Sequence, residues 1–140
     1  MNKNKKLLFL VNDLSFFISH RLMIAKASID KGFDVVIGYG DLGGANKNLI
    51  LQNGIRITHI PMHRGGLNIF NEFKLLIRIW KCFKEEKPDI VHLVTIKPYL
   101  YGGVISRLAG VPALVSAVSG LGTIFIGKEL RYKILRLFLY

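Results

Sequence analysis

Short apolar runs alternate along this chain with longer segments in which apolar residues recur at helical spacing. Each run is followed by a glycine, a proline or a polar residue, which is typical of buried strands in a parallel sheet. We therefore predict strands at Leu7–Val11, Phe33–Tyr39, Ile55–Ile60, Asp89–Val94 and Ala113–Val118. Helices are predicted at Phe16–Lys31, Asn46–Asn53, Ile69–Glu86, Tyr99–Ala109 and Lys128–Tyr140.

Strands that alternate with helices predict an α/β fold, a Rossmann-like, doubly wound parallel sheet with helices on both faces. Right-handed crossovers give strand order 3-2-1-4-5, in which the first and fourth strands are neighbours at the switch point. The loops Asn12–Ser15 and Thr95–Pro98 then face each other across a crevice, beside the segment Ser119–Gly122. Ligands of open α/β sheets bind in such a crevice.

The helix Ile69–Glu86 has the clearest periodicity, and its apolar stripe is predicted to face the core. That stripe comprises Ile69, Phe73, Leu76, Ile77, Trp80 and Phe83. The basic residues of the helix lie mostly off the stripe and are expected to form a solvated face: Lys74, Arg78, Lys81 and Lys84.

The length of 140 residues suits one domain, and a formal net charge of +11 predicts an anionic partner, either nucleic acid or an acidic membrane surface. The single cysteine, Cys82, excludes an intrachain disulfide and fits a reducing cytosol. The run Leu7–Val11 is too short for the core of an export signal. The segment Lys128–Tyr140 mixes basic and apolar residues, which favours an anionic membrane interface.

Candidate ligand-binding residues follow the first and fourth strands. Lys97 offers a cation for an anionic or hydroxyl-rich ligand, and Pro98 after it favours an extended backbone. As an exposed side chain, Lys97 is expected to contribute little to packing. We expect Asn12, Asp13 and Thr95 to converge with it on one cavity.

Further candidates lie close to the predicted crevice. His20 is a candidate general base beside Arg21, and the alternative is a surface or satisfied core histidine. Arg64 lies in a glycine-rich loop that either reaches over the crevice or forms a solvated turn. Gly120 and Gly122 permit close approach of the backbone to a ligand, or a tight turn. No metal site is predicted, because the histidines lack carboxylate or cysteine partners at ligand spacing.

The sequence excludes two functions that involve a nucleotide or a phosphoryl group, namely dinucleotide binding and phospho-acceptance. The segment Asn12–Phe17 lacks the G-x-G-x-x-G fingerprint of dinucleotide binding, and no cofactor is predicted. A phospho-acceptor receiver domain needs an aspartate at the end of the third strand, where Ile60-Pro61-Met62 stands instead.

Several segments carry a family resemblance when they are taken together. They are Val-Asn-Asp at 11–13, Phe-Phe-Ile-Ser-His-Arg at 16–21, Pro-Asp-Ile-Val-His at 88–92, Thr-Ile-Lys-Pro at 95–98 and Ser-Gly-Leu-Gly at 119–122. With them the chain resembles, from Leu7 to about Phe125, the N-terminal half of a family 4 glycosyltransferase of the GT-B type. The subgroup it is similar to builds bacterial surface polysaccharides and lipid-linked oligosaccharides.

The resemblance implies a retaining glycosyltransferase whose acceptor side is residues 1–127, with residues 128–140 beginning a further helix. The acceptor is expected to be polyprenyl-linked or a saccharide, and the nucleotide sugar is expected to bind a C-terminal domain that carries Glu-x₇-Glu. This chain has no such pair and is expected to be inactive alone. Ser119 stands where many relatives place a histidine. The implied location is cytoplasmic, peripheral on the inner face of the cell membrane.

Two other classes of function are compatible with the sequence. A stand-alone module that binds membrane or carrier lipid without catalysis would explain both the charge and the length. A nucleic-acid binder would explain the charge alone, but the helix Ile69–Glu86 does not interleave basic and aromatic residues as base stacking requires, so nucleic acid is not the expected partner.

Overall fold

A five-stranded parallel sheet in the order β3-β2-β1-β4-β5 forms the centre of the molecule, which confirms the predicted topology. The computed structural model describes residues 4–62 and 68–118. The strands are β1 (Lys6–Asp13), β2 (Asp34–Asp41), β3 (Arg56–His59), β4 (Ile90–Val94) and β5 (Ala113–Ala117). The helices are α1 (Leu14–His20), α2 (Leu22–Asp30), α3 (Lys47–Leu51), α4 (Ile69–Glu86) and α5 (Ile96–Ala109).

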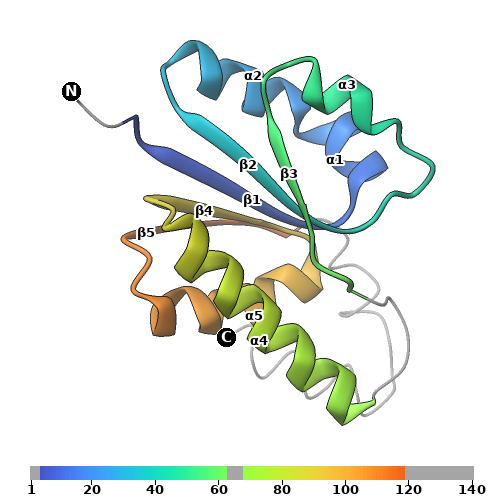
Figure 1. Cartoon of the computed structure of the whole chain (residues 1–140), viewed down its shortest axis with the longest axis vertical. Coiled ribbons are helices and arrows are strands. Elements are labelled where there is room, and N and C mark those ends of the chain that lie inside the picture. Colours follow the sequence, from blue (N-terminus) through green and yellow to red (C-terminus); the bar gives the residue numbers. More distant parts are fainter. Residues whose placement is uncertain (1–3, 63–67, 119–140) are drawn as a thin grey trace.

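The helices cover the two faces of the sheet in separate layers, with α1, α2 and α3 on one face and α4 and α5 on the other (Figure 1). Each layer of helices covers one hydrophobic core. Phe9, Val11 and Phe17 belong to the core under α1 and α2, and Leu8 and Leu10 belong to the core under α4 and α5. The central strand β1 therefore buries both of its faces, as its continuous apolar run predicts.

Two predicted helix boundaries are wrong. The helix expected at Phe16–Lys31 is divided at Arg21 into α1 and α2. The hydroxyl of Ser19 donates to the carbonyls of Ser15 and Phe16, and such bonds from side chain to backbone favour a helix end. The helix expected to begin at Tyr99 begins at Ile96, because Pro98 is tolerated in the first turn, where its missing N–H leaves no bond unmade.

The bounds of α4 match the prediction, but the predicted buried stripe is wrong. The residues of α4 that are buried are Leu75, Ile79, Cys82 and Phe83. Most of the predicted stripe is exposed to solvent instead: Ile69, Phe73, Ile77 and Trp80, together with Phe70. Only Phe83 of the predicted stripe is fully buried, so α4 turns a second apolar face outward.

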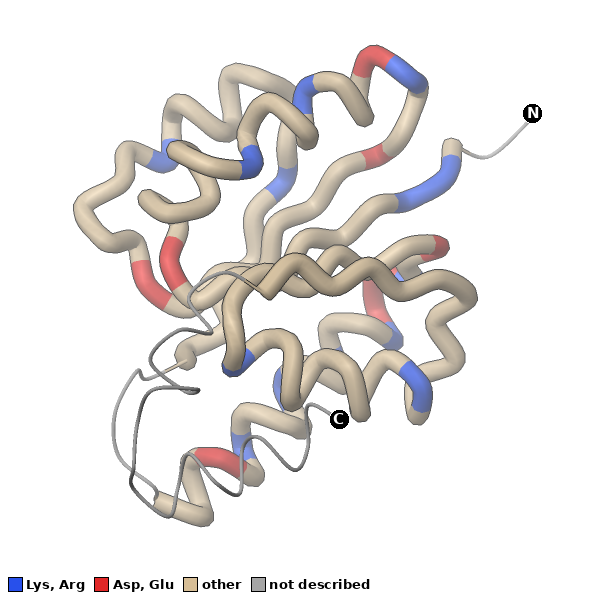
Figure 2. Tube along the Cα trace, turned by 180° about the vertical axis from the view of Figure 1, so that it is seen from behind, with Lys and Arg blue, Asp and Glu red and all other residues tan. Residues whose placement is uncertain are grey.

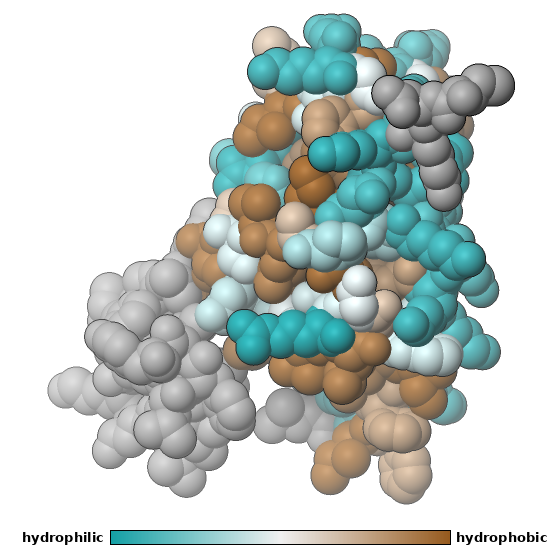
Figure 3. Space-filling model, turned by 90° about the vertical axis from the view of Figure 1, so that its left-hand side faces the viewer, coloured by the Kyte–Doolittle hydropathy of each residue, from teal (hydrophilic) through white to brown (hydrophobic). Residues whose placement is uncertain are grey.

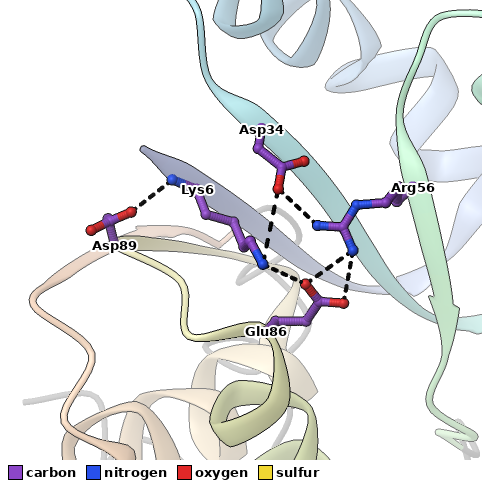
Figure 4. Close-up of polar contacts among 5 residues, drawn as sticks. All are labelled: Lys6, Asp34, Arg56, Glu86 and Asp89. Atoms are coloured by element: carbon purple, nitrogen blue, oxygen red, sulfur yellow. Dashed lines mark hydrogen bonds and ion pairs between the residues drawn. The ribbon is translucent and has the colours of Figure 1, made fainter. Parts of the chain in front are cut away.

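A network of charged side chains joins the amino ends of the strands (Figure 4). The carboxylate of Glu86 accepts from Lys6 Nζ at 2.9 Å and from Arg56 Nη1 at 3.0 Å. Arg56 Nη2 also lies 2.8 Å from Asp34 Oδ2, and the backbone N–H of Lys6 donates to Asp89 at 2.7 Å. These contacts tie β1, β2, β3 and the end of α4 together at the edge of the sheet where the strands begin.

Candidate functional site

A cavity of about 410 Å³ lies where β1 and β4 end. The two strands are hydrogen-bonded neighbours, so the chain leaves the sheet in divergent directions at this point. Four polar side chains from the end of β1 and the start of α5 line the cavity together with apolar walls, and the lining residues are Asn12, Asp13, Phe16, Thr95, Ile96 and Lys97. The structure thus brings together four of the residues that the sequence singled out, Asn12, Asp13, Thr95 and Lys97.

Two polar atoms in this region are buried and make no hydrogen bond within the described residues, the Oδ1 of Asn12 and the Oγ1 of Thr95. Thr95 also has φ 74° and ψ 171°, which an L-residue with a branched side chain rarely adopts. Buried polar atoms without a partner are costly, and strained backbone is concentrated at functional sites. Asn12 and Thr95 therefore each keep an unused hydrogen-bonding atom beside the cavity.

Asp13 has a structural task at the edge of the cavity. Its carboxylate caps α1, accepting from the backbone N–H of Phe16 at 3.0 Å and from the hydroxyl of Ser15 at 2.6 Å. Gly43 packs directly on that carboxylate with φ 56°, and a side chain at position 43 would collide with it. Asp13 therefore fixes the start of α1 and the neighbouring loop.

Lys97 lies in the first turn of α5 and not in an extended loop. Its Nζ is 2.8 Å from Oε1 of Glu72 in the first turn of α4, and the side chains are only 19% and 18% exposed. The expectation of an exposed lysine that contributes little to packing is therefore wrong. The ammonium also lies 5.8 Å from the ring centroid of Tyr101. Burial raises the pKa of Tyr101 to about 12, and a hydrogen bond to Glu72 and its charge add to the shift.

His20 and Arg21 do not line the cavity. The ring of His20 stacks on Phe16 at 4.2 Å between centroids, and its Nδ1 is 2.7 Å from the hydroxyl of Ser19. Arg21 lies at the junction of α1 and α2, and its Nε is buried without a hydrogen bond. Burial lowers the pKa of His92 on β4, and the charge of Arg21 lowers it further. Neither His20 nor Arg21 therefore belongs to the described lining of the cavity.

The remaining predicted site residues, Arg64, Ser119, Gly120 and Gly122, lie outside the described residues. Among the residues that the structure describes, no three His, Cys, Asp or Glu side chains come together as metal ligands.

Sequence reasoning missed Glu72, Tyr101 and Phe16 as parts of this region. The available signal was that α4 and α5 both follow a strand and so begin at the same edge of the sheet. An acidic residue in the first turn of one helix can then meet a lysine in the first turn of the other, as Glu72 meets Lys97.

Residues 6–140 match the family described as "Glycosyl transferase 4-like". Over 70 residues the chain is 36% identical to the UDP-Gal:alpha-D-GlcNAc-diphosphoundecaprenol alpha-1,3-galactosyltransferase of Escherichia coli. That match covers 50% of this chain and 18% of the relative, so the matched segment spans less than a fifth of the length of that curated protein.

Solved structures share the fold. MurG of Acinetobacter baumannii superimposes with a TM-score of 0.62 at 22% identity, over 79% of this chain and 33% of that protein. A UDP-N-acetylglucosamine 2-epimerase gives a TM-score of 0.66 at 15% identity, over 96% of this chain and 39% of that protein. At these identities the likeness concerns the fold alone, and in each case this chain corresponds to well under half of the other protein.

Proposed function

Because this chain belongs to the glycosyl transferase 4-like family, we propose that it forms the acceptor-binding half of a retaining glycosyltransferase. The enzyme transfers a sugar from a nucleotide sugar to a lipid-linked or polysaccharide acceptor. The observation that carries this proposal is the cavity at the switch point, where Asn12 and Thr95 hold buried polar atoms that lack a partner.

The acceptor we propose is a sugar on a polyprenyl diphosphate. The amide of Asn12 and the hydroxyl of Thr95 hydrogen-bond to sugar hydroxyls, which supplies the partners that these groups lack in the described part of the chain. The ammonium of Lys97, held by Glu72, attracts the diphosphate. The name of the E. coli relative supports this chemistry, because that protein is named for transfer to a GlcNAc-diphosphoundecaprenol.

His20 remains the proposed general base. Its Nδ1 lies within hydrogen-bond distance of Ser19 and of the carbonyl of Phe16, so Nε2 is the nitrogen that would accept the proton of the acceptor hydroxyl. Its ring is separated from the cavity by Phe16, on which it stacks. His20 therefore acts only if the acceptor extends past Phe16.

We infer that the nucleotide sugar binds a separate donor domain and that residues 1–127 are the acceptor-side domain. The 140-residue chain by itself then transfers no sugar, because donor and acceptor must be held together for the reaction. We place the enzyme at the inner face of the cell membrane, where a polyprenyl-linked acceptor is embedded. Within residues 4–62 and 68–118, no helix is both long and apolar enough to cross the bilayer.

Calorimetric titration of the 140-residue chain with GlcNAc-diphosphate on a short prenyl chain tests the proposal. We expect binding that weakens at least about tenfold in Thr95→Val, because a buried acceptor of a hydrogen bond is lost. The matched control is Thr58→Val on β3, which should leave the affinity unchanged. Equal affinity in Thr95→Val, or tighter binding of UDP-galactose than of the acceptor analogue, would contradict the proposal.

A further inference from the structure

Helix α4 carries a continuous apolar surface that the described part of the chain leaves uncovered. We call it the α4 apolar face, and its residues with their exposed fractions are Ile69 (81%), Phe70 (79%), Phe73 (62%), Ile77 (40%) and Trp80 (42%). In contrast, α2, α3 and α5 each expose only two large apolar side chains. In Figure 3 the lowest part of the molecule, where α4 begins, is brown. An exposed apolar patch of this kind marks an interaction site.

The position of this face on the helix determines which partner it suits. At about 100° per residue, three stripes run along α4. One stripe is buried against the sheet and contains Leu75 and Ile79. The α4 apolar face lies next to it, and a basic stripe follows on the far side, made of Lys74, Arg78, Lys81 and Lys84. Figure 2 shows basic positions repeated along α4, and Glu85 is the acidic residue beside them.

We propose that α4 is the element that docks this protein onto an anionic lipid bilayer, with its apolar face in the interface and its basic stripe against the lipid phosphates. Helices that bind in the interface of anionic membranes typically carry apolar and aromatic side chains beside a row of lysines and arginines. The basic residues complement the negative surface charge, and each contributes about a fivefold increase in affinity. Lys84 also lies 6.0 Å from the ring centroid of Trp80, so cation and ring enter the interface together.

Docking through α4 brings the cavity to the lipid surface. Glu72 of α4 holds Lys97, which lines the cavity, and the helix begins at the same edge of the sheet. Ile69 and Phe73 lie about 60° and 100° around the helix from Glu72. The start of α4 therefore spans the distance between bilayer and cavity, where a diphosphate attached to a membrane lipid would lie. This last step rests on the proposed function, whereas the docking itself rests on α4 alone.

Vesicle sedimentation and fluorescence of the 140-residue chain test the docking. The chain has a single tryptophan, Trp80, so its emission reports directly on the α4 apolar face. With vesicles of phosphatidylethanolamine and phosphatidylglycerol we expect binding, a blue shift of the emission and quenching by brominated lipid. Phosphatidylcholine vesicles should bind more weakly, and added salt should reduce binding to the anionic ones.

Matched variants distinguish binding through the α4 apolar face and its basic stripe from nonspecific hydrophobic or electrostatic binding to the vesicle. Phe70→Ser with Phe73→Ser should weaken binding at least about tenfold, because two aromatic rings are then no longer transferred from water into the membrane interface. Lys74→Gln with Lys81→Gln should weaken it about 25-fold, at about fivefold for each charge. Control variants at exposed apolar and basic residues on the other layer should change binding less than about twofold: Met23→Ser with Leu51→Ser, and Lys31→Gln with Lys47→Gln.

Three results would overturn the inference. The first is sedimentation with vesicles while the Trp80 emission stays unchanged, because the protein would then bind through another surface. The second is an equal loss of binding in the control variants. The third is a blue shift that depends on protein concentration without lipid, which would show that a second copy covers the face. Binding of the acceptor analogue in lipid-free buffer is measured in parallel and should be unchanged in Phe70→Ser with Phe73→Ser, so failure of docking and failure of the proposed function are distinguishable.

Discussion

The ion pair between Lys97 and Glu72 links the cavity to α4, and its strength can be measured. The two side chains are 2.8 Å apart and more than four-fifths shielded from water. Exposed pairs couple by about 0.2–1 kcal/mol, whereas removal of one partner from a buried pair costs about 3–5 kcal/mol. For this partly buried pair we expect each single variant to lose about 2 kcal/mol of unfolding free energy, with a coupling energy of about 1–2 kcal/mol.

A double-mutant cycle measures this coupling by urea unfolding followed by circular dichroism. Lys97→Met keeps the apolar stem of the side chain, and Glu72→Gln keeps a hydrogen-bonding group for Tyr101. The double variant should be more stable than the sum of the single losses predicts, because the two side chains interact directly and each single variant already removes that interaction. The coupling should shrink only slightly in salt, since the pair is shielded.

The control for this cycle is Lys31→Met, an exposed lysine on the other side of the sheet, which should change stability by less than about 0.5 kcal/mol. A coupling energy below about 0.3 kcal/mol would refute the reasoning, because the two side chains would then act independently. The result also governs how Lys97→Ala is interpreted in an activity assay. The measured rate of sugar transfer has to be divided by the fraction of folded protein.

Three further predictions concern the core. Burial lowers the pKa of His92, so below about pH 6.5 the unfolded chain binds a proton more readily than the native chain. The thermal midpoint should therefore fall between about pH 7 and about pH 5, and less so in His92→Gln; equal slopes would contradict this. Burial raises the pKa of Cys82 to about 12, so a thiol reagent should label it slowly in native protein and quickly in urea. Gly102→Ala, whose new Cβ would lie 2.5 Å from Leu93, should cost about 1 kcal/mol, whereas Gly103→Ala, at 3.9 Å, should be neutral or stabilising; the reverse order in urea midpoints would refute the packing argument.

The topology was predictable because each strand is a separate apolar run and the handedness of crossovers leaves few arrangements. The switch point, and with it the cavity between Asn12 and Thr95, follows from strand order alone. The partner of Lys97 follows only in part from the topology. The shared edge of the sheet brings the starts of α4 and α5 together, but the contact of Lys97 with Glu72 also depends on how the two helices pack, which no local pattern specifies.

The orientation of α4 shows where periodicity fails. Two apolar stripes run along this helix, one through Phe73 and Ile77 and one through Leu75 and Ile79. Both have helical spacing, so the pattern does not tell which of them faces the sheet. The stripe with more aromatic residues was the natural choice for the core, but it is the exposed one. The helix has more apolar residues than one buried face needs and also carries a basic stripe. This combination indicated that one apolar face does not pack against the sheet.

The charged network around Glu86 has a consequence for how this domain can be redesigned. It fastens β1, β2 and β3 to α4 at one edge of the sheet, and the cavity lies at the opposite edge. Side chains at the cavity edge can therefore be varied on an unchanged scaffold, as long as the contacts that hold that edge are kept. Chimeras that exchange loop residues with relatives should retain Gly43, which packs on Asp13, together with Lys6, Arg56 and Glu86.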